Sequence, residues 1–291
     1  MKYLRMIPLL TILTLAILPA ASPQVVNIPT AWTSNGLSLN WSGYAVNVTG
    51  VTSVSGSFIV PTVSAPCGVN GFTGDVSAWV GIDGYSTGTV EQTGVSGSCD
   101  PTTGAASYYA WWEMYPRAST IIKTMTVNPG DSITASVMYN SGGSFTISIS
   151  DTTNSQSFTT TVHAPVGGHN VAQRSSAEWV VERAATIYKG YLTILPLATF
   201  TSIIFNEATF TIGSGSPASL QSATITYPPC IGTPHETSCY DQMTMVSVDS
   251  SHNITPLVLT SGISSNSFSV SFLANGTPYP IPGAIGHKGP K

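Results

Sequence analysis

Charged residues are scarce in this sequence. Asp, Glu, Lys and Arg together make up 8% of its 291 residues, whereas a typical protein carries about 25%. A surface with so few ionisable groups changes little when the pH falls, because few carboxylates lose a favourable charge on protonation. The formal net charge of −4 gives no electrostatic reason to expect a nucleic-acid partner. The composition is compatible with an acidic environment.

Long hydrophobic runs are also scarce, and the one that stands out lies near the N-terminus. It covers residues 7–18, follows Lys2 and Arg5, and precedes the small residues "PAAS" at 19–22. A run of 12 residues is short for a bilayer span, so a retained membrane anchor is the weaker alternative. The pattern predicts a signal peptide over residues 1–22.

Cleavage of that signal predicts a secreted, extracellular protein. We interpret residues 23–38 as a short leader or pro-segment, 39–275 as the folded domain and 276–291 as an irregular C-terminal tail. Loss of Lys2 and Arg5 leaves 7 basic against 13 acidic residues, a formal charge of −6. We expect a monomer that has no membrane attachment after cleavage.

Cysteine is limited to four residues, and none of them has the spacing of a zinc site. No Cys-x-x-Cys or His-Glu-x-x-His pattern occurs, so we expect neither a metal nor a cofactor. An even number of cysteines in an exported chain predicts two disulfides, with three possible connectivities. Proximity in the sequence favours Cys230–Cys239, which leaves Cys67–Cys99 by elimination.

Helical patterns are missing beyond the N-terminal segment. Alternating or continuous apolar runs recur instead, and turn residues separate them. These runs predict strands at residues 51–61, 76–84, 107–116, 132–140, 144–152, 177–184, 223–228, 243–250 and 267–275. The turn "NSGG" at 140–143 is a hairpin signal between two of them. So many strands without helices predict an all-β fold, an antiparallel two-sheet β-sandwich of the concanavalin-like jelly-roll type.

Several catalytic signatures are absent or out of context. The stretch "GYSTG" at 84–88 matches Gly-x-Ser-x-Gly, but that elbow needs a following helix, which the sequence does not predict. The Asp-Thr-Gly or Asp-Ser-Gly signature of pepsin-like proteases does not occur. His163 and His169 flank the turn-like stretch "APVGG", so we interpret them as surface residues.

Carboxylates and large aromatic side chains share faces of the expected strands. If 177–182 is a strand, Glu178 and Glu182 lie on one face. The same alternation groups Trp111, Glu113 and Tyr115, and it groups Trp79 with Asp83. Such a set fits the floor of a cleft, where burial raises a carboxylate pKa. The alternative is that each carboxylate is solvated or hydrogen-bonded at a sheet edge.

Five motifs occur in the order seen in a known peptidase family. They are "NWSGYAV" (40–46), "AWVGIDG" (78–84), "EQTGV" (91–95), "YYAWWEMYP" (108–116) and "SAEWVVE" (176–182). On these motifs the chain resembles the glutamic peptidases, also called eqolisins or peptidase family G1, over roughly residues 38–275. The resemblance implies a sandwich of two large antiparallel sheets with the active site on a concave face.

The resemblance also implies roles for particular residues. The family's catalytic glutamine and glutamate match Gln92 and Glu178. Trp79, Asp83 and Glu113 match further family positions, and Trp41 and Tyr115 lie in the shared motifs, so we expect these five to bind substrate or support the site. Tyr109 stands where founding members have an aspartate, which is a departure from the family.

A glutamate–glutamine pair suits amide hydrolysis. We expect Glu178, ionised even at mildly acidic pH, to take a proton from water as general base and to return it to the leaving amine. The uncharged Gln92 amide can stabilise the oxyanion. The expected function is that of a pepstatin-insensitive acid endopeptidase acting on protein or peptide substrates. Glu182 is expected to be a supporting or surface group.

Two other functions fit parts of the sequence. A carbohydrate-binding or carbohydrate-cleaving sandwich also places tryptophans and carboxylates on a concave sheet, and Glu113 with Glu178 could form its acidic pair. An inactive adhesion module would suit the Ser/Thr-rich composition. Gln92 has no role in a glycosidase, and the retention of both Gln92 and Glu178 argues against an inactive module.

Overall fold

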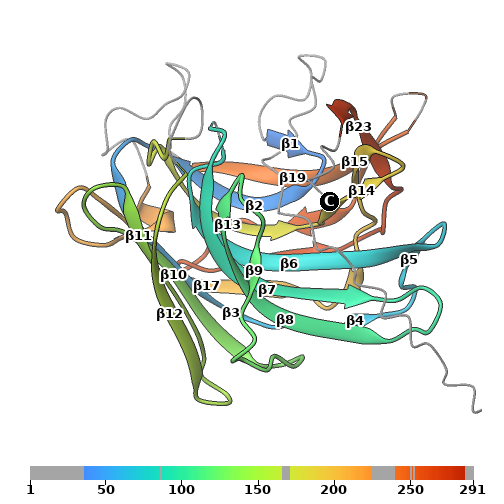
Figure 1. The fold of residues 1–291 in the computed structure, drawn as a ribbon, viewed down its shortest axis with the longest axis horizontal. Coiled ribbons are helices and arrows are strands. Elements are labelled where there is room, and N and C mark those ends of the chain that lie inside the picture. Colours follow the sequence, from blue (N-terminus) through green and yellow to red (C-terminus); the bar gives the residue numbers. More distant parts are fainter. Residues whose placement is uncertain are drawn as a thin grey trace, which may run out of the picture.

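The fold consists of two curved antiparallel sheets packed face to face (Figure 1). The computed structural model describes residues 36–285 with the exception of 86, 166–170, 224–239, 250 and 252. In these ranges one 3₁₀ turn, Leu220–Ser222, is the single helical element. The expected all-β sandwich is thereby confirmed.

The first sheet has ten strands and contains the motifs singled out above. Its main path runs β1-β19-β2-β13-β6-β7-β8-β9, with β20 beside β19 and β5 beside β6. The bounds are β1 Gly36–Ser38, β2 Trp41–Asn47, β5 Gly68–Val69, β6 Phe72–Ile82, β7 Val90–Cys99, β8 Ala106–Tyr115, β9 Thr120–Ile121, β13 Ser176–Glu182, β19 Tyr240–Val248 and β20 Ile254–Pro256. Apart from the parallel β1–β19 pair, neighbouring strands in this sheet are antiparallel.

The second sheet has eight strands in the order β12-β11-β10-β3-β17-β22-β21, with β18 beside β17. The bounds are β3 Val51–Ile59, β10 Ser132–Tyr139, β11 Ser144–Asp151, β12 Gln156–His163, β17 Ile203–Ile212, β18 Ala218–Ser219, β21 Val258–Thr260 and β22 Phe268–Phe272. Two small sheets complete the fold. One joins β14 Ala185–Tyr188, β15 Tyr191–Ile194 and β23 Tyr279–Ile285, and the other joins β4 Val63–Ser64 and β16 Thr199–Phe200.

The main hydrophobic core lies between the two large sheets. Strands β3, β10 and β17 pack on β6, β7 and β13, and alternate side chains of each strand point into the space between them. Trp179 of β13 enters this core, donates a hydrogen bond from Nε1 to the Ser55 carbonyl at 2.8 Å and meets Phe210 edge-on at 6.5 Å between ring centroids. A Cβ at Gly56 would lie 2.9 Å from Cδ1 of Trp179. A glycine at position 56 therefore allows the indole to pack against β3.

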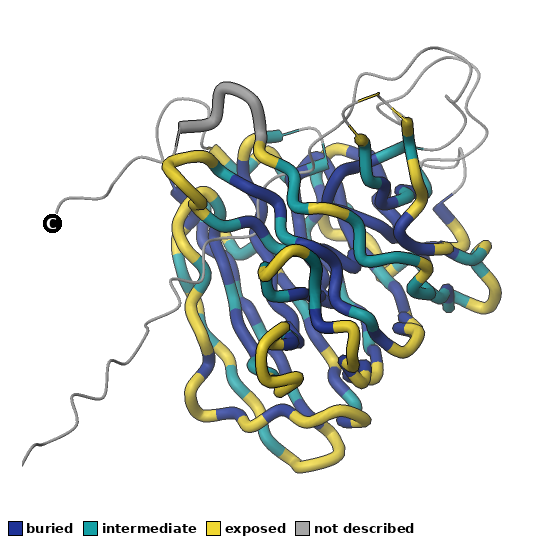
Figure 2. The backbone as a smooth tube through the Cα atoms, turned by 90° about the vertical axis from the view of Figure 1, so that its right-hand side faces the viewer, coloured by how far each residue is buried: buried dark blue, intermediate teal, exposed yellow. Residues whose placement is uncertain are grey.

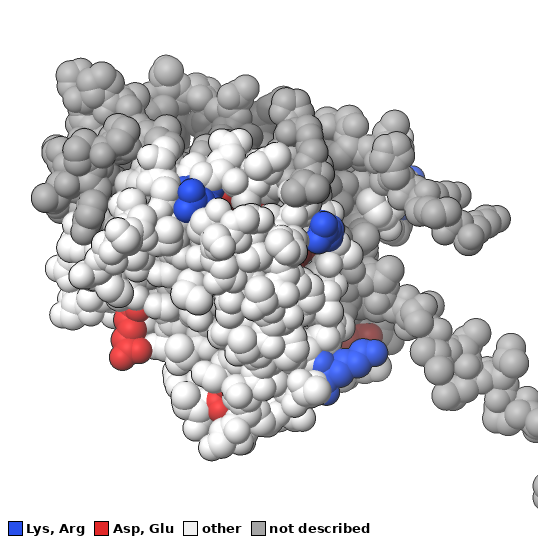
Figure 3. Space-filling view, turned by 60° about the vertical axis from the view of Figure 1, so that its left-hand side comes forward, with Lys and Arg blue, Asp and Glu red and all other residues white. Residues whose placement is uncertain are grey.

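The outer face of the second sheet is covered by hydroxyl groups instead of charges. Cross-strand pairs such as Ser53–Thr211 and Ser55–Thr209 bond at 2.8 Å, and Ser148 pairs with Thr159 at 3.1 Å. Charged side chains are sparse on the face shown in Figure 3. Most strand segments are buried and the connecting turns are exposed (Figure 2). Serine and threonine pairs, in place of charged residues, make the hydrogen bonds on the outer face of the second sheet.

Most of the expected strands are present, and the hairpin at 140–143 is confirmed. β10 and β11 pair in antiparallel register from Tyr139–Phe145 onward. The expected strand at 223–228 lies outside the described residues apart from Ala223, which is not in a strand. Two segments differ from expectation. Strand β23 lies within the expected irregular tail, and β1 lies within the expected leader.

None of the described segments forms a helix with the length and hydropathy needed to cross a bilayer.

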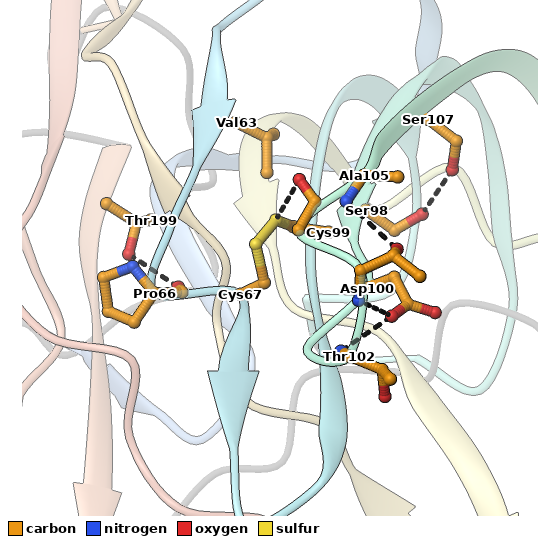
Figure 4. The surroundings of a disulfide bond; sticks show 12 residues. Val63, Pro66, Cys67, Ser98, Cys99, Asp100, Thr102, Ala105, Ser107 and Thr199 are labelled. Atoms are coloured by element: carbon orange, nitrogen blue, oxygen red, sulfur yellow. Dashed lines mark hydrogen bonds between the residues drawn. A yellow bond between two sulfur atoms is a disulfide. The ribbon is translucent and has the colours of Figure 1, made fainter.

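One disulfide, Cys67–Cys99, links the start of β5 to the end of β7 (Figure 4). The expected pairing of these two cysteines is confirmed, whereas Cys230 and Cys239 lie outside the described residues. Neighbouring hydrogen bonds hold both ends, with the Thr199 hydroxyl donating to the Pro66 carbonyl at 3.1 Å. The carboxylate of Asp100 accepts two backbone N–H bonds in the turn after Cys99.

We expect the Cys67→Ser/Cys99→Ser double variant to unfold more easily than the wild type. The disulfide closes a loop with a sequence separation of 32, and loss of such a constraint typically costs about 2–4 kcal/mol. Denaturant unfolding of both proteins measures the difference. Equal midpoints and slopes would show that the strand pairing alone holds this end of the sheet.

Candidate active site

Four strands bring the two candidate catalytic residues to one row across the first sheet. The register pairs Glu178 of β13 with Gly81 of β6, Gly81 with Gln92 of β7, and Gln92 with Glu113 of β8. Residues paired directly across strands project from the same face. Glu178, Gln92 and Glu113 therefore share the face turned away from the core between the sheets, where β13, β6, β7 and β8 run side by side (Figure 1).

Gly81 separates the glutamate from the glutamine. Since neighbouring strands are about 4.8 Å apart, the backbones of Glu178 and Gln92 stand roughly 10 Å apart, and the position between them carries no side chain of its own. A Cβ at Gly81 would lie 2.9 Å from Cζ3 of Trp79 and 3.2 Å from Cβ of Gln92. The glycine therefore allows the Trp79 ring and the Gln92 side chain to pack closely over β6.

Glu113 orients the Gln92 side chain. Nε2 of Gln92 donates a hydrogen bond to Oε2 of Glu113 at 2.6 Å, and both side chains are fully buried. Oε1 of Gln92 has no hydrogen-bond partner among the described residues. One N–H of the amide is thus held by Glu113, while no described residue bonds to its oxygen, which leaves the amide with unused hydrogen-bonding capacity.

Glu178 lies in an environment that favours its neutral form. The residue has no exposed surface, and neither carboxyl oxygen has a geometrically acceptable hydrogen bond among the described residues. Burial raises the pKa of Glu178 well above its ordinary value, the negative charges of Asp83 and Glu91 raise it further, and the Ser176 hydroxyl opposes the shift. Burial thus favours the neutral form of Glu178, and the expectation that it is ionised at mildly acidic pH stays a prediction.

Three tryptophans form the floor beside this row. Trp41, Trp79 and Trp111 are buried on the same side of the sheet, together with Val180 and Met243. The rings of Trp41 and Trp79 meet edge-on with centroids 4.8 Å apart. The indole N–H groups of Trp41 and Trp111 have no hydrogen-bond partner among the described residues. The floor is apolar and has two indole donors that are not engaged by a described residue.

Glu182 is hydrogen-bonded to one of these tryptophans. Oε2 accepts a hydrogen bond from Nε1 of Trp79 at 2.9 Å, and Oε1 accepts one from Nδ2 of Asn40 at 3.0 Å. Burial raises the pKa of Glu182 to about 8, although these hydrogen bonds and the nearby Trp41 indole oppose the rise. Glu182 is thus a buried supporting group, one of the two roles expected for it.

Asp83 does not join the row but holds the segment that leads into β13. Its φ of 68° is left-handed, and its carboxylate accepts the backbone N–H groups of residues 173, 174 and 175 at 2.7–2.8 Å. The Ser175 hydroxyl donates to it as well, at 3.0 Å. These hydrogen bonds fix the position of the chain three residues before Glu178.

Tyr115, at the end of β8, packs against the tryptophan floor.

Two acidic residues at the site were not anticipated from the sequence. Glu91 precedes Gln92 and therefore points to the opposite face, where burial and the neighbouring Asp83 carboxylate raise its pKa well above the ordinary value. Asp241 pairs with Ala45, which pairs with Glu178, so it extends the row on the other side. Strand alternation within "EQTGV" gives the orientation of Glu91, but its contact with Asp83 arises from the tertiary structure.

No group of three or more His, Cys, Asp or Glu side chains suited to a metal ion occurs among the described residues.

We expect the protein to be most stable in acid and to lose stability as the pH rises toward neutral. Glu182 and Asp75 have folded-state pKa values of about 8 and about 7, above their ordinary 4.5 and 3.8. Between these values the folded state retains protons that the unfolded state has released, so the free energy of unfolding falls with rising pH. Thermal unfolding from acid to mildly alkaline pH measures the slope.

Glu182→Gln should flatten that slope, because the amide is neutral at every pH and keeps an acceptor for Trp79. Glu207→Gln is the matched control, since Glu207 is exposed on the second sheet. A melting temperature that rises toward neutral pH in the wild type would contradict the prediction.

Comparison with known proteins identifies the family. The model of the peptidase A4 family matches residues 39–262. Aspergillopepsin-2 of Aspergillus niger is 32% identical over 224 residues, covering 72% of this chain and 76% of its own. Scytalidopepsin B of Scytalidium lignicola is 29% identical over 191 residues, covering 64% and 68%. The crystal structure of scytalido-glutamic peptidase with a transition state analog inhibitor superposes with a TM-score of 0.63 at 22% identity, covering 80% of this chain and 98% of that one. The resemblance read from the five motifs is confirmed, and the chain belongs to the peptidase A4 family of glutamic peptidases.

Proposed function

We propose that the protein is a secreted acid endopeptidase that hydrolyses peptide bonds with Glu178 and Gln92, without sensitivity to pepstatin. The observation that carries the proposal is the row in which both side chains share a sheet face across Gly81. Scytalido-glutamic peptidase binds a peptide-based transition state analog, and a peptide substrate for this chain is inferred from that relationship. The signal-like N-terminus supports secretion.

In this proposal the reacting carbonyl and a water molecule bind between the side chains of Glu178 and Gln92. Glu178 takes a proton from the water as the water oxygen attacks the carbonyl carbon, which forms a tetrahedral intermediate with a negative oxygen. An N–H of Gln92 donates to this oxyanion. Glu178 then returns the proton to the amide nitrogen, the C–N bond breaks, and a carboxylic acid and an amine leave.

The raised pKa of Glu178 suits both halves of this cycle. A carboxylate with a raised pKa is a stronger base than an exposed glutamate, so it accepts the proton of water more readily. Its acid form also persists to higher pH, which favours return of the proton to the leaving amine. Gln92 remains neutral throughout, so the site avoids the repulsion that two ionised carboxylates would have.

A glycosidase is the less suitable function. The Gln92 amide lies between Glu113 and Glu178 in the row, and it is bonded to Glu113 at 2.6 Å. The two carboxyl groups of a glycosidase instead flank the sugar directly. The arrangement therefore favours amide over glycoside hydrolysis.

Glu178→Gln should lower kcat on a denatured protein substrate by about 10²- to 10⁴-fold, since it removes the proton acceptor. Gln92→Ala should lower it by about 10²- to 10³-fold, the usual loss for one oxyanion donor. Glu178→Gln and the control Glu207→Gln should retain the wild-type melting behaviour in acid, whereas Gln92→Ala should melt somewhat lower because it breaks the buried bond to Glu113, so its activity is measured well below its melting temperature. Full activity in either site variant would show that the dyad is misassigned.

Glu113 is proposed as a positioning residue for Gln92. Glu113→Ala should lower kcat by about tenfold while KM changes little, because loss of one buried hydrogen bond costs about 1–2 kcal/mol. Glu113→Gln keeps an acceptor and should restore most of the rate. Equal losses in the alanine and glutamine variants would indicate that the charge of Glu113, and not the hydrogen bond, matters.

A further inference from the structure

The row of Glu178 and Gln92 occupies one end of a longer surface on the first sheet. Along β6 the same face continues from Gly81 through Trp79 and Ser77 to Asp75, which pairs with Ser98 of β7, and Ser98 in turn pairs with Ser107 of β8. Six residues of a strand span about 20 Å. A cavity of about 480 Å³ lies at that far end.

The cavity has a polar floor and an aromatic rim. Asp75, Ser98, Ser107 and Tyr109 belong to its floor, and residues 70–73 and 184–188 line its walls. Phe72 and Tyr188 come from opposite walls and meet edge-on with ring centroids 4.7 Å apart. Figure 1 places the β14–β15 hairpin near the end of the first sheet where β5 joins β6.

Asp75 is an unusual residue for such a place. Only 6% of it is exposed, and Oδ1 has no hydrogen-bond partner among the described residues. The backbone N–H of Ala184 is the group that favours its charged form, but burial dominates and raises the pKa of Asp75 to about 7. A buried carboxyl oxygen without a partner is costly, and a donor entering the cavity would remove that cost.

Neither of the two described cations near the cavity is bonded to Asp75. The Arg183 side chain donates to the carbonyls of Leu39, Thr277 and Val246. Nζ of Lys189 lies 5.1 Å from the centroid of the Tyr188 ring. The charge of Asp75 raises the pKa of Tyr109 and of Glu182, and neither of these groups can supply a positive charge.

We propose that this cavity binds the side chain of a lysine or arginine of the substrate, four to six residues from the bond that is cut. A cation that reaches Oδ1 of Asp75 would pass the aromatic rim formed by Phe72 and Tyr188, and aromatic rings attract cations. Its charge would favour the ionised form of Asp75, which burial alone disfavours, and the carboxylate would then bond to it. The Tyr109 and Asp75 positions lie four and six strand residues from Gly81, and an extended peptide has the same rise per residue. The inference rests on the proposed peptidase function.

Matched peptides test the proposal. Each contains one cleavable bond and a single lysine, placed from two to eight residues away on either side, and its partner has norleucine at that place. We expect lysine to raise kcat/KM by about tenfold or more at one position four to six residues away, the size of a partly buried charge pair. Asp75→Asn should bring the lysine-to-norleucine ratio close to one.

A second variant protects the test against misfolding of the first. Tyr188→Leu removes one exposed aromatic ring and should reduce the lysine preference by about threefold to tenfold, whereas the control Glu207→Gln should leave it unchanged. A lysine-to-norleucine ratio near one at all positions in the wild type, or a preference that survives Asp75→Asn, would overturn the proposal. Preference for norleucine would show that the cavity takes apolar side chains.

A binding assay separates failure of this proposal from failure of the proposed function. If the wild type cleaves none of the peptides, the peptidase assignment fails, and the cavity is tested by fluorescence anisotropy with the lysine and norleucine peptides on Glu178→Gln protein. Tighter binding of the lysine peptide that is lost when Asp75→Asn is added supports the cavity by itself. Equal binding of both peptides refutes it.

Discussion

The register among β13, β6, β7 and β8 is the constraint on which the site depends. Glu178, Gly81, Gln92 and Glu113 come from four separate strands, and they share a face because each is paired directly with the next. A slip by one residue would turn every side chain of a strand to the other face. Burial on both faces prevents such a slip, since core residues cover one side and tryptophans the other.

The chain concentrates its few carboxyl groups inside the first sheet. Six of its 13 acidic residues are buried in or next to this sheet, namely Asp75, Asp83, Glu91, Glu113, Glu178 and Glu182, while hydroxyl pairs cover the outside of the second sheet. Burial raises the pKa of a carboxyl group, so a buried carboxyl stays protonated over a wider pH range than an exposed one. Protonation of these groups in acid therefore increases the free energy of unfolding. Scarcity of surface charge and abundance of buried carboxyls therefore act in the same direction, toward stability in acid.

The floor of the first sheet extends well beyond the reacting residues. From the Glu178 row it continues through the tryptophans to Asp75 without an irregularity in the β6–β7 register. Glu182 ties the tryptophan floor to Asn40, and Asp83 fixes the entry to β13.

The sequence by itself determined the elements and the directions in which their side chains point. Period-2 alternation placed Glu178 and Glu182 on one face of β13, the "NSGG" turn joined β10 to β11, and the five motifs indicated the family.

Three features could not be predicted from the sequence: the contact between Glu91 and Asp83, the cavity beside Asp75, and the burial that raises the pKa of Glu178. Those features depend on which strands become neighbours. β13 lies between β2 and β6, although about 90 residues separate Asp83 from the segment that it holds. Alternation is a property of one strand, whereas burial and contact between carboxyl groups are properties of the assembled sheets, because only packing removes water from them.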